Sequence, residues 1–229
     1  MSAELASEDV GYDVLENEPP DVLAANLSVA GYLLAGATAF FFLAFLFAFF
    51  YLRSIDSHGM WKPPGVTASV GWGTAIVVCL AAVAVLLRLS VRDREAERLS
   101  AWRLKGVVAL LLGIAALALQ AVAWSENGFG PTDGAYASVY VGWTAFLFLF
   151  VLITLFWLET TLATSFRYAK LPRSSKPELG HASGDPGRLA HDISDPLALV
   201  QVELKALSFY WTFLTGIAVL AWILLYLVA

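Results

Sequence analysis

The stretch LSVAGYLLAGATAFFFLAFLFAFFYL, residues 27–52, decides the fold class of this 229-residue chain. It contains no charged side chain, and a helix needs only about 20 apolar residues to cross the core of a bilayer. Four further stretches, 70–87, 106–124, 136–158 and 207–228, are apolar enough to cross as well. The sequence therefore predicts an all-α fold, a polytopic membrane helical bundle with five transmembrane helices.

The composition of the whole chain agrees with this prediction. Hydrophobic residues make up 59% and charged residues 14%, whereas soluble domains average roughly 45–50% and about 25%. The net charge of −5 leaves no basic surface for nucleic acid, so we expect no nucleic-acid partner. The single cysteine, Cys79, excludes an internal disulfide and a cysteine-based metal site.

The domain organisation follows from where the polar residues fall. Residues 1–26 carry seven acids and no Lys or Arg, which excludes a signal peptide and predicts an acidic cytoplasmic tail, solvated or docked on a basic partner. Residues 27–229 form the predicted membrane domain. Within it, the segment 167–200 is rich in Pro, Gly, Ser and charge, which predicts a mobile cytoplasmic loop.

The orientation in the membrane follows from the basic residues. Twelve of the 14 Lys and Arg residues lie between the second and third spans or between the fourth and fifth. Only Arg53 and Lys62 lie in the other two loops. Because basic loops stay in the cytoplasm, we expect a cytoplasmic N-terminus and an extracytoplasmic C-terminus.

The chemistry available to the chain is narrow. Its three histidines, His58, His181 and His191, all lie in loops, so no pair can ligate haem or copper within the bilayer. No predicted span carries an ionisable residue at its middle, which argues against an ion pump or channel. Ser138 and Thr144 have no His or carboxylate beside them to make a nucleophile. We expect no catalytic, cofactor or metal site of its own.

Tryptophans and basic residues near the span ends are the remaining candidates for contact with lipid. Their pattern is typical of an interfacial aromatic belt, although some could line a groove facing partner subunits. The basic residues Arg53, Lys62 and Arg88 could bind lipid phosphates, and snorkelling explains them equally well. The tryptophans concerned are Trp61, Trp72, Trp124, Trp143, Trp211 and Trp222.

Five local patterns, taken in order, resemble subunit III of haem-copper cytochrome c and quinol oxidases. The resemblance covers roughly residue 27 to the C-terminus, and bacterial members of that family often have five spans. The patterns are TAFFFLAF (38–45), GMWKPPG (59–65), QAVAW (120–124), DGAYAS (133–138) and FYWTF (209–213).

The chain departs from the family at its intramembrane polar positions, so it looks like a divergent member. Apolar or hydroxyl residues stand where the family has Glu, His or Asp. A role in proton uptake would depend on the missing groups, whereas a packing role would not. The positions are Thr38 and Ala123 for Glu, Leu147 and Phe150 for a His pair, and Thr212 and Thr215 for His and Asp.

The resemblance implies a redox-inactive accessory subunit of a terminal oxidase in a bacterial cell membrane. It would pack against subunit I, beside subunit II, and hold membrane phospholipids. The complex would reduce O2 with electrons from cytochrome c or quinol, and haem and copper would lie in partner subunits. The candidate lipid or subunit-interface residues are Thr38, Phe41, Phe42, Arg53, Trp61, Arg88, Trp124, Tyr136, Trp211 and Phe213.

Three alternatives stay open. A related accessory protein of nitric oxide reductases would share the same motifs. A stand-alone small-molecule transporter would need polar residues converging at the bilayer midplane, and the spans have almost none. A membrane scaffold unrelated to respiration would also lack an active site, but it gives no reason for the ordered patterns.

Overall fold

The computed structural model describes residues 20–56, 59–169 and 196–229. This part of the chain is helical, without strands, and five of its helices are long and apolar enough to cross a membrane. The predicted all-α polytopic bundle is thus confirmed. The helices are α1 (Pro20–Ser54), α2 (Val70–Glu95), α3 (Leu99–Glu126), α4 (Ala135–Ala169) and α5 (Pro196–Trp222), and α5 continues as a π-helix, η2 (Ile223–Val228).

Every helix extends beyond its apolar stretch. α1 begins at Pro20, so its first residues lie within the predicted acidic tail 1–26. α4 runs to Ala169 and α5 begins at Pro196, so both helices enter the predicted loop 167–200. The rest of that loop, the tail before residue 20 and the three histidines lie outside the described residues.

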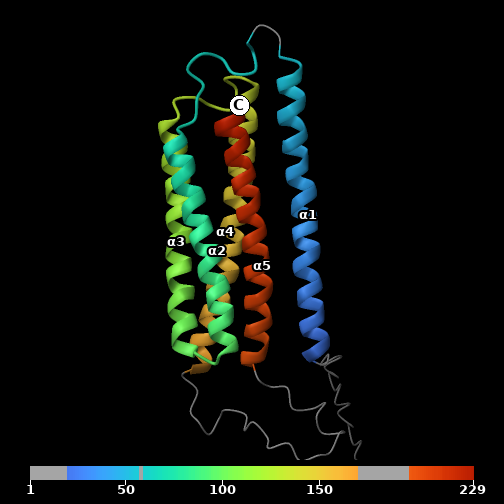
Figure 1. The fold of residues 1–229 in the computed structure, drawn as a ribbon, viewed down its shortest axis with the longest axis vertical. Helices are drawn as coiled ribbons and strands as arrows, with labels where there is room; N and C mark the ends of the chain where they lie inside the picture. The colour runs from blue at the N-terminus through green and yellow to red at the C-terminus, as the bar shows by residue number, and fades with distance from the viewer. Residues whose placement is uncertain (1–19, 57–58, 170–195) are drawn as a thin grey trace, which may run out of the picture.

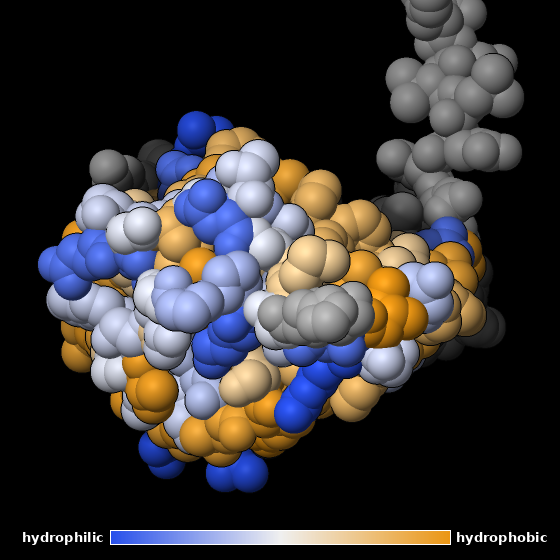
Figure 2. Space-filling view, turned by 90° about the horizontal axis from the view of Figure 1, so that it is seen from above, coloured by the Kyte–Doolittle hydropathy of each residue, from blue (hydrophilic) through white to orange (hydrophobic). Residues whose placement is uncertain are grey.

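The helices alternate in direction, and α1 lies at the side of the bundle (Figure 1). α2 packs on α3 and α5, α4 packs on α3 and α5, and α1 packs on α5 and α4. One end holds the short α2–α3 turn and the basic residues of α2, α3 and α5, and we call it the basic end. The other end holds the connections 55–69 and 127–134, and we call it the aromatic end. Figure 2 looks onto the aromatic end, where polar side chains lie over the middle and at several edges of the view, with apolar ones between them.

The α2–α3 turn at the basic end is held by charge and backbone contacts. Asp93 is nearly buried and forms an ion pair with Lys105 of the following helix. The backbone N–H of Arg98 donates to the carbonyl of Asp93 at 2.8 Å. Glu97 has a positive φ of 56°, which lets the chain reverse within three residues.

Small residues let α3 approach α4 closely. Gly106, Ala109, Gly113 and Ala116 are all buried, at the alternating spacing of three and four residues that keeps them on one face. A Cβ at Gly113 would meet Cγ and Cδ1 of Leu155 at 3.3 Å, with Cδ2 closer still. Lipid tails are as apolar as leucine, so helices associate in a bilayer through such close packing.

Candidate functional site

Aromatic rings join two of the motif segments, 59–65 and 133–138, to α1 at the aromatic end. The ring of Trp61, from the GMWKPPG connection, lies 5.2 Å from Phe49 of α1 and 5.9 Å from Tyr136 of α4, centroid to centroid. The backbone N–H of Tyr136 donates to the carbonyl of Trp61 at 2.8 Å. All three side chains are buried. The connection 59–65 is therefore part of the core and ties α1 to the start of α4.

A second contact joins segments 59–65 and 133–138 through Gly134. Gly134 has a φ of +135°, which L side chains rarely adopt, and a Cβ there would lie 2.7 Å from Cδ of Pro63. The ammonium group of Lys62 lies 4.7 Å from the centre of the Tyr136 ring. The Tyr136 hydroxyl in turn donates to the carbonyl of Leu225 at 2.9 Å, which ties α4 to η2.

Two hydrogen bonds cross between helices deeper in the bundle. The Thr38 hydroxyl donates to the carbonyl of Leu34 at 2.8 Å, so its oxygen accepts from the Tyr210 hydroxyl, 2.9 Å away. The indole N–H of Trp211 donates to the carbonyl of Leu80 at 3.1 Å. α5 is thereby bonded to α1 on one side and to α2 on the other.

Phenylalanines of α1 fill the space against α4. Phe42 is only 2% exposed, and its ring lies 6.0 Å from that of Trp143. Phe41 is 36% exposed and lies 4.7 Å from Phe146 with an interplanar angle of 67°. Such edge-to-face pairs contribute about 0.5–1.5 kcal/mol each beyond the area they bury.

The structure divides the ten candidate interface residues into two sets. Five are buried within this chain, where they hold its own helices together: Thr38, Phe42, Trp61, Tyr136 and Trp211. Five reach the outside at least in part: Phe41, Arg53, Arg88, Trp124 and Phe213. Of this second set, Arg88 and Phe213 line a common pocket.

The predicted aromatic belt is wrong for half of its tryptophans. Trp61, Trp143 and Trp211 are at most 6% exposed and belong to the core. Trp72 and Trp222 are half-buried near the aromatic end, and their indole N–H groups donate to Glu126 at 2.7 Å and to Thr74 at 3.1 Å. The half-buried Trp124 donates to Thr144 at 3.0 Å. The position of a tryptophan near a span end predicts its depth in the membrane, but it does not predict whether the ring faces the lipid or the core.

Trp102 and Arg103, at the start of α3, were missed as structural residues. Trp102 is fully buried. The Arg103 guanidinium donates to the hydroxyl and the carbonyl of Ser165 on α4, at 2.6 Å and 2.7 Å. The sequence does not indicate the burial of Trp102 or the hydrogen bonds of Arg103, because both depend on which helices are neighbours.

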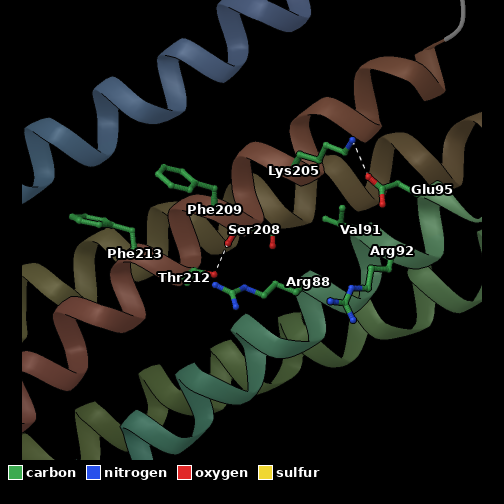
Figure 3. Close-up of a pocket in the computed structure, with 9 residues that line it drawn as sticks. All are labelled: Arg88, Val91, Arg92, Glu95, Lys205, Ser208, Phe209, Thr212 and Phe213. Carbon is green, nitrogen blue, oxygen red and sulfur yellow. Dashed lines mark hydrogen bonds and ion pairs between the residues drawn. The ribbon is translucent and has the colours of Figure 1, made fainter.

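A groove between α2 and α5 at the basic end combines cations with aromatic rings. Arg88 and Arg92 line it from α2, and Lys205, Phe209 and Phe213 line it from α5 (Figure 3). The spacing of four residues between the two arginines, which places them on one helical face, is the sequence signal that could have identified it. Its volume is about 650 Å³.

The described part of the chain has few buried side chains that could take part in catalysis or bind a metal ion. Apart from Asp93, its buried polar side chains are hydroxyls and one amide, Gln120. Within residues 20–56, 59–169 and 196–229, no three His, Cys, Asp or Glu side chains gather where they could hold a metal ion. The arrangement can pack, hydrogen-bond and bind an anion.

No protein-family model matches the chain, and no curated protein matches it either.

Proposed function

We propose that this chain is a redox-inactive accessory subunit of a haem-copper terminal oxidase in a bacterial cell membrane. It packs against the catalytic subunit, holds phospholipids, and leaves haem, copper and the electron donor to its partners. Its N-terminus is cytoplasmic and its C-terminus extracytoplasmic.

The observation that carries the proposal is that the motif segments touch one another. Segments 38–45 and 209–213 meet through Thr38 and Tyr210 at 2.9 Å. Segments 59–65 and 133–138 meet through Trp61 and Tyr136 at 2.8 Å. Residues that carry the resemblance to subunit III thus make the contacts that join the helices, as a role in packing requires.

The transporter alternative fits the same contacts less well. A transport path needs polar groups converging on a cavity near the bilayer midplane. At mid-depth of the span Ala25–Ser54, the one buried polar side chain is Thr38, and Leu34 and Tyr210 satisfy its hydroxyl. The rings of Phe42 and Trp143 fill the neighbouring space between α1 and α4.

The deciding experiment is purification in a mild detergent through an N-terminal tag, because the Ala229 carbonyl at the other end accepts from Lys62 at 3.4 Å. We expect a haem absorption spectrum and partner chains in fixed stoichiometry. Consumption of O2 by the preparation indicates an oxidase, and consumption of nitric oxide instead indicates the reductase alternative. A homogeneous monomer or homo-oligomer without haem would refute the proposal.

A matched pair of variants tests whether the motif contacts matter for assembly. Trp61→Ala removes the buried ring between Phe49 and Tyr136. Trp72→Ala removes an indole of the same size that is half-buried near the same end. We expect the haem recovered per tagged chain to fall several-fold in the first variant and to stay at the wild-type level in the second. Equal recovery from both would contradict the proposed link.

A further inference from the structure

The groove between α2 and α5 has its cations on one helix. Arg88 and Arg92 are both exposed, and no hydrogen bond or ion pair joins either guanidinium to another described residue. Lys205, across the groove, is already paired with Glu95 at 2.9 Å. Figure 3 shows the Arg88 side chain extending toward α5, beside Thr212. Two adjacent guanidinium groups are thus free to bind an anion.

Arg88 directly follows the apolar stretch 70–87 of α2, at the height where a membrane-spanning helix reaches the lipid headgroups. It lies seven residues before the end of α2 at Glu95, which is about 10 Å along the helix at 1.5 Å per residue. An unpaired cation inside a membrane-spanning helix is costly unless it reaches water or meets an anion. A phosphate at this height would satisfy both arginines, because the planar guanidinium matches phosphate oxygens in pairs.

The groove also has an apolar part, beside the polar side chains of Ser208 and Thr212. Val91, Phe209 and Phe213 line it beside the cations. Gly216 follows Phe213 by three residues on α5, is exposed, and would have nothing within 4 Å of an added Cβ. The exposed face of α5 therefore continues from the groove toward the middle of the bilayer as an open apolar track.

We propose that this groove is a binding site for an anionic phospholipid, with the phosphodiester between Arg88 and Arg92 and an acyl chain along Phe209, Phe213 and Gly216. The volume of about 650 Å³ suits a headgroup and the upper part of one chain. A partner helix seated here would bury two unpaired guanidinium groups, which a lipid phosphate neutralises instead. The inference deepens the lipid-holding part of the proposed function and names the lipid class and its residues.

The test measures lipid bound to the purified full-length chain by native mass spectrometry. Dioleoyl phosphatidylglycerol and dioleoyl phosphatidylcholine, which have identical chains, are offered at equal concentration. We expect a preference for phosphatidylglycerol, and a loss of about 25-fold in that preference in Arg88→Gln/Arg92→Gln, since each basic residue near a membrane surface contributes roughly fivefold. Equal binding of the two lipids by the wild-type chain would overturn the proposal.

The matched control is Arg98→Gln/Arg167→Gln, which removes the same charge from the same end. Arg98 is 71% exposed at its side chain, and neither residue lines the groove. We expect this variant to keep the wild-type preference, and a parallel loss would show general attraction to the basic end. Helical circular dichroism of both variants should match the wild type, which separates lost binding from lost fold.

A third comparison separates a lipid from a free phosphate. Glycerol phosphate offers the headgroup chemistry without acyl chains, and we expect it not to displace phosphatidylglycerol at millimolar concentration. Displacement would show that the apolar track contributes nothing, and would overturn the lipid assignment. All these measurements use the chain without respiratory partners, so absence of co-purified haem would refute the oxidase proposal and leave this result unaffected.

Discussion

Replacing Gly113 with alanine should loosen the contact between α3 and α4. In a helix interior, Gly→Ala by itself stabilises by about 0.5–1 kcal/mol. At Gly113 the added methyl would also press on Leu155, whose Cγ and Cδ1 would lie at 3.3 Å with Cδ2 closer. Leu155 is only 4% exposed, so its side chain has little room to move. Forcing a methyl into a packed site costs about 1–3 kcal/mol.

Gly216→Ala is the matched control. It makes the same change in a membrane helix at a position where an added Cβ meets nothing within 4 Å. The two variants share the gain in helix propensity, so the difference between them isolates the clash. We expect Gly113→Ala to have a free energy of unfolding lower than that of Gly216→Ala by about 1–3 kcal/mol.

The assay is reversible unfolding of the purified chain by increasing SDS in mild detergent, followed by circular dichroism and tryptophan fluorescence. A Leu155→Ala change in the Gly113→Ala background should restore part of the loss, with a coupling of about 0.5–3 kcal/mol in the double-mutant cycle. If Gly113→Ala proves as stable as Gly216→Ala, or if the two changes at 113 and 155 add independently, the close approach inferred for α3 and α4 is refuted.

Two further changes test polar contacts with the same unfolding assay. Thr38→Val removes the acceptor for the Tyr210 hydroxyl and should cost only about 0.6 kcal/mol, the average for hydrogen bonds within membranes. In the proposed oxidase complex, this change should leave assembly and turnover near wild type, and a loss of proton-pumping efficiency alone would contradict a purely structural role. Lys105→Met leaves the nearly buried Asp93 without its close partner and should cost about 1–3 kcal/mol, whereas Lys205→Met breaks an exposed pair and should cost less than about 1 kcal/mol. Equal losses from the two lysine variants would show that burial of Asp93 adds nothing.

The existence and order of the helices could be predicted from apolar stretches, and their ends could not. The fourth stretch ends at residue 158, but α4 continues to Ala169. Its last turns hold buried hydroxyl residues, including Ser165, which accepts from Arg103 of α3. Polar residues extend a membrane helix when a neighbouring helix supplies their partners, and a sequence does not state which helices are neighbours.

The same limit applies to the candidate sites. Arg88 was a candidate for lipid contact from its position near a span end, but the groove also requires Phe209 and Phe213, which follow it by more than a hundred residues. Trp211 is a tryptophan of the kind expected in an interfacial belt, but its indole N–H donates a hydrogen bond to the carbonyl of Leu80 in the core. Which face of a span turns inward depends on packing between helices, and in a uniformly apolar span hydrophobicity does not mark that face.

A bilayer also changes which substitutions matter. Phe40 of α1 is 78% exposed, and in lipid its replacement by leucine exchanges one apolar surface for another. A single methyl at Gly113 meets a buried side chain at less than contact distance, although it leaves the chain more hydrophobic. The 59% hydrophobic content identifies the membrane class, but it therefore says almost nothing about the arrangement of the helices. That arrangement depends on side-chain size at buried positions and on the few hydroxyl, indole and guanidinium groups that reach a neighbouring backbone.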